Sequence, residues 1–151
     1  MPGFLFDTNV WIASVFPAHP HYTRAQRALH GASHVLPAVF CRATQQGFLR
    51  LATTQALIQT FDVDGFSNRD AVAALKALLN LPQVVERPEA PGLSAIWHKL
   101  ASRDTAAPNV WMDAYLAAFA ITGGLQMVTL DHDFRQFEAH GLKLTLLDVP
   151  G

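Results

Sequence analysis

The sequence contains only one cysteine, Cys41, among its 151 residues. A single thiol cannot build a disulfide framework within the chain, and it cannot provide the cysteine ligands of a structural zinc site. We expect Cys41 to be a small buried side chain, which is the usual state of a free cysteine. The fold must therefore depend on a hydrophobic core and on backbone hydrogen bonds.

The sequence also lacks the segments that direct a protein to a membrane. No apolar run approaches the roughly 18 residues that a membrane-spanning helix needs. No basic segment precedes the first short apolar run, as it would in a signal peptide. We therefore expect a soluble protein that works in the cytoplasm.

A strong charge of either sign is missing as well. The formal net charge is -1 and the pI is about 6.6, whereas strong nucleic-acid binders usually carry a clear basic excess. The charge is unevenly distributed, because the first 50 residues contain four arginines and four histidines but one acid, Asp7. A weakly basic surface around this aspartate is one interpretation of the pattern, and chance is the other.

Several common catalytic signatures are absent too. The chain has no Walker A loop, no Gly-x-Gly-x-x-Gly fingerprint and no Gly-x-Ser-x-Gly nucleophile elbow. Its seven histidines never show the His-Glu-x-x-His spacing of a zinc protease. These absences argue against phosphate-loop, dinucleotide-binding, serine-hydrolase and zinc-protease chemistry.

What is present is a regular alternation of strand-like and helix-like segments. Half of the residues are hydrophobic, which is enough for the core of one domain over residues 1–151. We predict strands within 3–6, 33–40, 81–88 and 142–149, and a strand followed by a loop within 125–134. We predict helices within 9–16, 19–32, 41–54, 67–80, 93–104 and 108–122. This alternation predicts an α/β fold with a mostly parallel central sheet and helices on both faces.

Three aspartates lie at or just beyond the ends of predicted strands. Asp7 ends the apolar run at residues 4–6, and Asp131 and Asp133 follow the run at 127–130 in the same way. Functional side chains in parallel sheets gather at the carboxyl ends of the strands. Each acid also has a structural explanation, because Asp7 is suited to cap the next helix and the other two are common turn residues.

Asp113 is the acid that is hardest to explain structurally. It lies on the predicted helix 108–122 within an otherwise apolar stripe, and an unpaired buried charge costs several kcal/mol. The nearest cations along the chain are Arg103 and Arg135, and the helix itself carries none. If Asp113 converges with Asp7 and with Asp131 or Asp133, a hard divalent cation such as Mg²⁺ or Mn²⁺ would relieve their repulsion.

Four stretches in this order resemble the PIN-domain family, and specifically the VapC-type toxins of bacterial type II toxin–antitoxin pairs. They are FLFDTNVWI near the start, FCRATQQGFLRLAT in the middle, NVWMDAYLAAFA on the late helix and MVTLDHDF near the end. The resemblance covers nearly the whole chain. It implies a PIN-like, Rossmann-like α/β/α sandwich and a Mg²⁺-dependent endoribonuclease that cleaves RNA phosphodiester bonds by metal-activated water.

The resemblance also implies roles for individual residues. Asp7, Asp113 and Asp131 match the first, third and fourth metal-binding acids of the family, and Asp133 lies beside the last of them. Thr129 matches a polar residue that orients the carboxylates or the metal-bound waters. Thr8 and Asn9 match residues of the same kind.

One position departs from the family pattern. The second acid is commonly a glutamate, and Gln45 in TQQGF aligns with it. Glutamine can still offer a neutral oxygen to a metal-bound water, so the resemblance keeps Gln45 as a site residue.

The alternative function is a catalytically weak PIN-like module that binds RNA or a protein without cutting. A receiver-like phosphoacceptor domain suits the sequence less well, because no lysine lies between Lys99 and Lys143.

The resemblance finally implies two protein partners, a second copy of the chain in a homodimer and a VapB-like antitoxin. The high apolar content for this size agrees with an apolar association surface. We expect Trp11 and the early helices to contribute to that surface.

Overall fold

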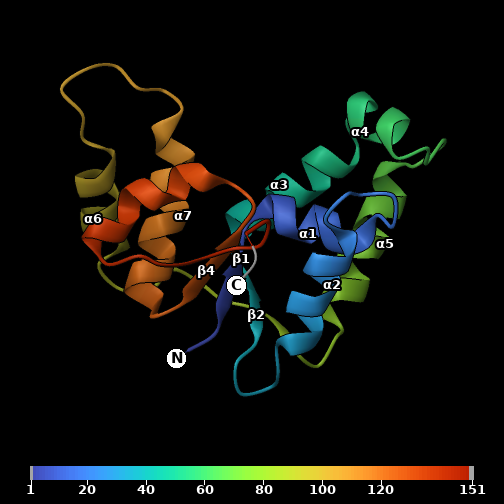
Figure 1. The fold of residues 1–151 in the computed structure, drawn as a ribbon, viewed down its shortest axis with the longest axis horizontal. Helices are drawn as coiled ribbons and strands as arrows, with labels where there is room; N and C mark the ends of the chain where they lie inside the picture. The colour runs from blue at the N-terminus through green and yellow to red at the C-terminus, as the bar shows by residue number, and fades with distance from the viewer. Residues whose placement is uncertain (1, 150–151) are drawn as a thin grey trace.

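A central sheet of five short strands organises the computed structural model, which describes residues 2–149 (Figure 1). The strand order is β3-β2-β1-β4-β5, and all four pairings are parallel. The strands are β1 (Phe4–Phe6), β2 (Ala38–Phe40), β3 (Val84–Glu86), β4 (Gln126–Thr129) and β5 (Lys143–Leu146). The expected parallel sheet is therefore confirmed.

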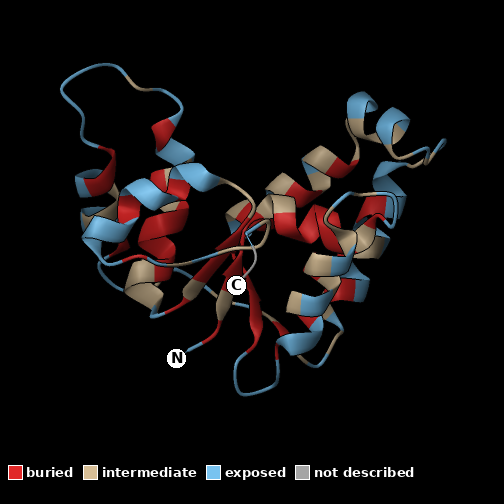
Figure 2. Ribbon diagram, viewed as in Figure 1, coloured by how far each residue is buried: buried red, intermediate tan, exposed pale blue. Residues whose placement is uncertain are grey.

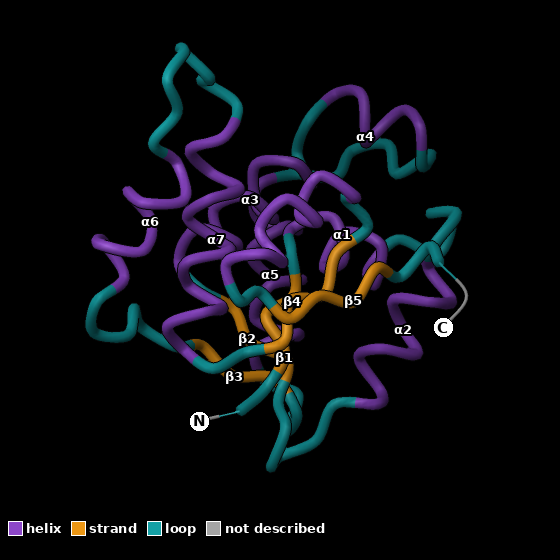
Figure 3. Tube along the Cα trace, turned by 60° about the vertical axis from the view of Figure 1, so that its left-hand side comes forward, coloured by secondary structure: helices purple, strands orange, loops and turns teal. Residues whose placement is uncertain are grey.

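Helices cover both faces of this sheet, and Figure 3 shows the strands enclosed between them. The α-helices are α1 (Thr8–Val15), α2 (Tyr22–Gly31), α3 (Arg42–Ala52), α4 (Gln55–Thr60), α5 (Asn68–Leu79), α6 (Leu93–Ala101) and α7 (Val110–Gly123); a 3₁₀ helix, η1, spans His132–His140. One buried apolar cluster joins the sheet to α1, α2, α3 and α5, and a second joins it to α6, α7 and η1 (Figure 2). This arrangement is the expected α/β/α sandwich.

Local sequence signals explain where several helices begin and end. Ser67 caps α5, and its hydroxyl and the Asp70 carboxylate form a reciprocal capping box. Helix α7 is followed by its C-cap Gly124, which has a φ of 66° that a glycine adopts without strain. Asp7 is the N-cap of α1, so its structural explanation is correct. A cap at this place also fixes the carboxylate at the end of β1.

The pairing of β1 with β4 determines which residues meet beyond the strand ends. Phe6 lies opposite Val128, and the Asp7 amide continues the ladder by donating to the Val128 carbonyl oxygen at 2.9 Å. The chain leaves β1 towards β2 on one side, while β4 lies on the other side. Such a change of direction opens a crevice at the carboxyl ends of the strands, and Asp7 lies there.

Two helices were not expected from the sequence. Helix α4 has only six residues, which is too short to show a clear apolar period. The segment after β4 was expected to be a loop, but it forms η1. Among residues 2–149, no helix combines the length and apolar character needed to cross a bilayer.

The expectation that Trp11 contributes to an association surface is wrong. Its side chain has no exposed surface, and its ring stacks on Phe40 with 3.8 Å between centroids. The apolar run around Trp11 is buried because α1 packs directly on the sheet. Trp111, in contrast, is 51% exposed at the start of α7.

Helices α1 and α3 approach each other closely at Gly47. A Cβ atom at this position would lie only 2.5 Å from the Thr8 hydroxyl oxygen and 3.3 Å from the Thr8 Cβ. The missing side chain of Gly47 therefore allows the middle of α3 to rest against the first residue of α1, next to Asp7.

We expect Gly47→Ala to destabilise the protein by about 1–3 kcal/mol, the usual cost of forcing a methyl group into a packed interior. The better helix propensity of alanine, about 1 kcal/mol, offsets only part of this cost. Gly31→Ala on α2 is the matched control, because no atom lies within 4 Å of its added Cβ. Urea unfolding of both variants measures the difference, and a Gly47→Ala protein as stable as the parent would contradict this packing.

Candidate active site

The carboxylate of Asp7 is held by two hydrogen bonds at the end of β1. One oxygen, Oδ1, accepts from the Thr8 amide at 2.7 Å, and Oδ2 accepts from the Thr129 hydroxyl at 2.7 Å. The residue is only 8% exposed. Burial raises the pKa of Asp7, the two hydrogen bonds oppose that rise, and the nearby charge of Asp131 adds to it.

The Thr129 hydroxyl links Asp7 to the segment after β4. Its Oγ1 accepts from the Asp131 amide at 3.0 Å and from the Asn9 side-chain nitrogen at 3.5 Å. Asn9 in turn accepts from the Leu130 amide at 3.3 Å. The expected orienting residues Asn9 and Thr129 therefore lie together beside Asp7, and Thr8 contributes its backbone amide.

Asp131 and Asp133 occupy different environments although they are close in sequence. Asp131 caps η1, because its Oδ1 accepts from the Asp133 amide at 2.9 Å. Asp131 is half-buried, whereas Asp133 is exposed. Asp131 thus has a structural role as a cap, and it also brings its charge close enough to affect Asp7.

Asp113 belongs to α7, which covers the other face of the sheet from α1, and it lies close enough to the same acids to be affected by their charges. It forms no hydrogen bond or ion pair with another residue in the range 2–149, and Arg103 donates instead to Gln136. Partial burial, followed by the charges of Asp131, Asp7 and Asp133 in that order, raises the pKa of Asp113 to about 6. The acids predicted from the sequence therefore converge closely enough to repel one another.

The chemistry of these donors suits a hard divalent cation. Carboxylate oxygens are the preferred protein ligands of Mg²⁺, which usually binds one or two of them and keeps several waters. Among the described residues, no three acidic, imidazole or thiol groups lie close enough together to hold one metal ion. The observed arrangement therefore fits a cation held by few carboxylates and by water better than a closed cage of four acids.

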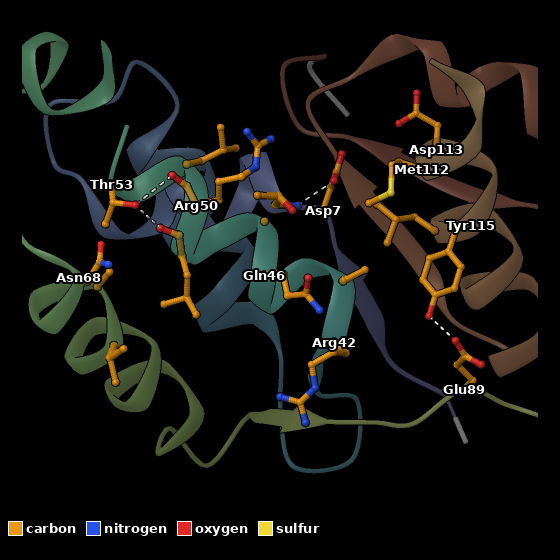
Figure 4. A pocket seen from close by; sticks show the side chains of 18 residues that line it. Asp7, Arg42, Gln46, Arg50, Thr53, Asn68, Glu89, Met112, Asp113 and Tyr115 are labelled. Atoms are coloured by element: carbon orange, nitrogen blue, oxygen red, sulfur yellow. Dashed lines mark hydrogen bonds between the residues drawn. The ribbon is translucent and has the colours of Figure 1, made fainter. Parts of the chain in front are cut away.

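A cleft of about 980 Å³ runs between α3 and α7, and Asp7 and Asp113 lie on its walls (Figure 4). The α7 side also carries Met112 and Tyr115, and the Tyr115 hydroxyl donates to Glu89 at 2.6 Å. Burial, followed by the hydrogen bond to Glu89, raises the pKa of Tyr115. The phenol therefore stays protonated at neutral pH and continues to donate.

Gln45 is not part of the cleft wall. It is 5% exposed, and its side-chain oxygen accepts from Arg42 at 3.0 Å. Its Nε2 is buried and has no hydrogen-bond partner among the residues that the structure describes. The next residue, Gln46, lines the cleft instead.

Sequence reasoning did not single out the arginines of the cleft as site residues, although a weakly basic surface around Asp7 was one interpretation of the charge distribution. Arg42 and Arg50 both lie on the α3 wall, eight residues apart. The signal that could have found them was the basic character of the first 50 residues, combined with the spacing of these two residues on one helix face.

Comparisons with known proteins agree with this geometry. The PIN domain model matches residues 4–139. Ribonuclease VapC41 of Mycobacterium tuberculosis is 43% identical over 145 residues, which cover 95% of this chain and 97% of that relative.

Two solved structures share the fold at lower sequence identity. VapC20 of M. tuberculosis, described as a sarcin–ricin loop cleaving toxin, has a TM-score of 0.61 and 21% identity over 93% of this chain and 96% of its own. VapBC2 from Rickettsia felis, bound to a DNA fragment from its promoter, has a TM-score of 0.59 and 13% identity over 97% of this chain and 98% of its own. The family match and the long alignment to a VapC ribonuclease show that the chain belongs to the PIN domain family, as a VapC-type member.

Proposed function

We propose that this protein is a Mg²⁺-dependent endoribonuclease, the toxin of a VapBC-type toxin–antitoxin pair. The observation that carries the proposal is that Asp7 and Asp113 line one cleft, with the charge of Asp131 close to both, in a chain that is 43% identical to a VapC ribonuclease. Carboxylates without a cationic partner at the edge of a core destabilise a fold. A cation-binding site would explain why these carboxylates lie close together.

The cation would be held by few direct carboxylates and largely through water, with Asp7, Asp113, Asp131 and Asp133 as the candidate ligands, and Mn²⁺ is an alternative to Mg²⁺. A bound divalent cation lowers the pKa of water and offsets negative charge on a phosphate. Asp7 is already fixed by Thr8 and Thr129, so it does not reorganise when a substrate binds. The pKa of Asp113 is about 6 without metal, and a bound cation would favour its ionised form.

The proposal extends to protein partners. VapBC2 of R. felis is a solved assembly of the same fold, and we infer a VapB-like antitoxin for this chain. Such a partner would inhibit by covering the acids, and an arginine is suited to this because its guanidinium pairs bidentately with a carboxylate. We also infer a homodimer, which is formed through apolar surface.

Asp7→Asn and Asp113→Asn should each reduce RNA cleavage by at least about a hundredfold, more than the loss of an indirect metal contact. The fold should persist, since each change keeps the side-chain shape. Asp104→Asn removes the same charge from an exposed loop residue outside the cleft and should cleave like the parent. Cleavage of labelled RNA with Mg²⁺ or EDTA and calorimetric titration of Mg²⁺ measure both activity and binding. An Asp7→Asn protein as active as the parent would contradict the assignment.

The metal-free protein should lose stability as pH rises from about 4 to about 6, the interval between the ordinary pKa of 3.8 and the raised pKa of Asp113. Across this interval the folded protein binds the proton more tightly than the unfolded chain does, so deprotonation favours unfolding. Asp113→Asn should flatten that part of the pH profile. Thermal melts in EDTA at several pH values provide the measurement, and an unchanged slope in Asp113→Asn would show that Asp113 does not titrate there.

The homodimer should depend on the exposed apolar residues at the start of α7. Trp111 and Met112 are 51% and 62% exposed, and neighbouring exposed apolar side chains often mark association surfaces. Trp111→Ser should shift the protein towards monomer in light scattering at tens of micromolar. Val35→Ser is the control, because Val35 is exposed on the distant loop before β2. A parent protein that is strictly monomeric at this concentration would refute the dimer.

A further inference from the structure

Helix α3 presents two arginines to the cleft. Asp7 lies between them in the direction of the helix axis. Arg42, Gln46 and Arg50 are spaced by four residues and all line the cleft (Figure 4), as expected for one face of a helix. Eight residues at about 1.5 Å each separate the two arginine backbones by roughly 12 Å along the helix axis. Gly47, where α3 touches Thr8, lies between them.

Arg42 is held in place by two contacts on different nitrogens. Its Nη1 donates to Gln45 Oε1 at 3.0 Å, and its Nη2 forms an ion pair with Glu86 Oε1 at 3.0 Å. A guanidinium has five N–H donors, so three remain for another acceptor. The Arg42 and Glu86 side chains are 70% and 43% exposed, and solvent weakens such an ion pair. Glu86 therefore orients Arg42 without cancelling its attraction for an anion.

Arg42 also lies where the main cleft meets a second cavity. This cavity has a volume of about 490 Å³ and shares Arg42, Glu89 and Tyr115 with the main cleft. Its volume falls in the range of about 300–1,000 Å³ that is typical of small-molecule sites. The half-buried ring of Tyr115 offers an aromatic surface of the kind on which unpaired bases stack.

Arg50 provides the second positive charge at the other end of the α3 face. Its side chain is exposed and has no hydrogen bond or ion pair to another residue within 2–149. Between the two arginines the cleft is acidic, because Asp7 and Asp113 line it. Cationic side chains on both sides of these acids would offset the repulsion between RNA phosphates and the carboxylates.

We propose that Arg42 and Arg50 bind the RNA phosphates on opposite sides of the scissile bond, and that the second cavity holds the nucleotide next to Arg42. This inference rests on the proposed ribonuclease function, because it places the scissile phosphate at Asp7 and Asp113. Gln45 and Glu86 are positioning residues that act through Arg42. The neutral amide of Gln45 orients the guanidinium and leaves its charge available to a phosphate.

The first experiment measures how each arginine contributes to RNA binding. Cleavage sites are mapped on total RNA, and a short fluorescein-labelled RNA with one mapped site then serves as the substrate. Arg42→Ala and Arg50→Ala should each raise KM about tenfold, the scale of one lost charge-assisted hydrogen bond, with a smaller effect on kcat. Each should also reduce the slope of log affinity against log salt by about 0.7, as expected for one contact to single-stranded RNA.

Three further variants separate charge, orientation and general effects on the fold. Arg27→Ala removes the same charge from the exposed face of α2, outside both cavities, and should leave KM and the salt slope unchanged. Arg42→Lys should restore the salt slope but only part of the affinity, because lysine lacks the bidentate fork. Glu86→Gln should raise KM while keeping the salt slope of the parent, because Arg42 keeps its charge but loses its orientation.

The second experiment assigns the two arginines to the two sides of the cut. RNA substrates carry one neutral methylphosphonate linkage, either before or after the scissile bond. When the linkage on one side of the scissile bond is neutral, Arg42→Ala should cause no further loss of RNA affinity. When the linkage on the other side is neutral, Arg50→Ala should cause no further loss of RNA affinity. If both arginines respond to the same linkage, or neither responds, the assignment is overturned.

The two proposals fail in distinguishable ways. A parent protein that neither cleaves nor binds RNA with Mg²⁺ or Mn²⁺ would refute the proposed function and this inference with it. A parent that cleaves RNA, together with arginine variants that keep its KM and salt slope, would refute only the inference.

Discussion

The hydrogen bond from the Thr129 hydroxyl to the Asp7 carboxylate is the interaction on which the site depends. Both residues are buried, so a carboxylate that lost this donor would remain in a largely apolar surrounding with little compensation. The same hydroxyl accepts from the amide of Asp131. One side chain at the end of β4 therefore fixes the positions of two acids, and the parallel register of β1 and β4 brings it to the correct place.

The site is electrostatically unfavourable without a cation, and the rest of the fold has to offset this. Asp113 has no ion-pair partner in the range that the structure describes, and its pKa rises through burial and through the charges of three other acids. Apolar clusters on both faces of the sheet supply the stabilisation. The acids thus lie where the two apolar clusters end, and their mutual repulsion lowers the stability of the fold.

Much of this organisation was predictable from the sequence, because strand ends and apolar periods are local signals. The order of strands and helices identified Asp7 and Asp131, and the apolar stripe around Asp113 identified the third acid. Positions on α3 were less predictable, since adjacent helical residues point about 100° apart. A difference of one position separates two glutamines with different environments: Gln45 is buried, whereas Gln46 lines the cleft. The contact between Tyr115 and Glu89 joins two segments that are separated along the chain, and no local sequence pattern predicts it.

The contact between Asp7 and Thr129 spans 122 positions of the chain, and contacts of such separation form late because long loops must close first. A growing polypeptide that has emerged only as far as α7 already contains Asp7 and Asp113, but it has neither β4 nor the hydroxyl that orients the first acid. The first acid is therefore oriented only after β4 has emerged and paired with β1. For a protein proposed to cut RNA, this order of assembly would keep the site incomplete while the segments before β4 are being translated.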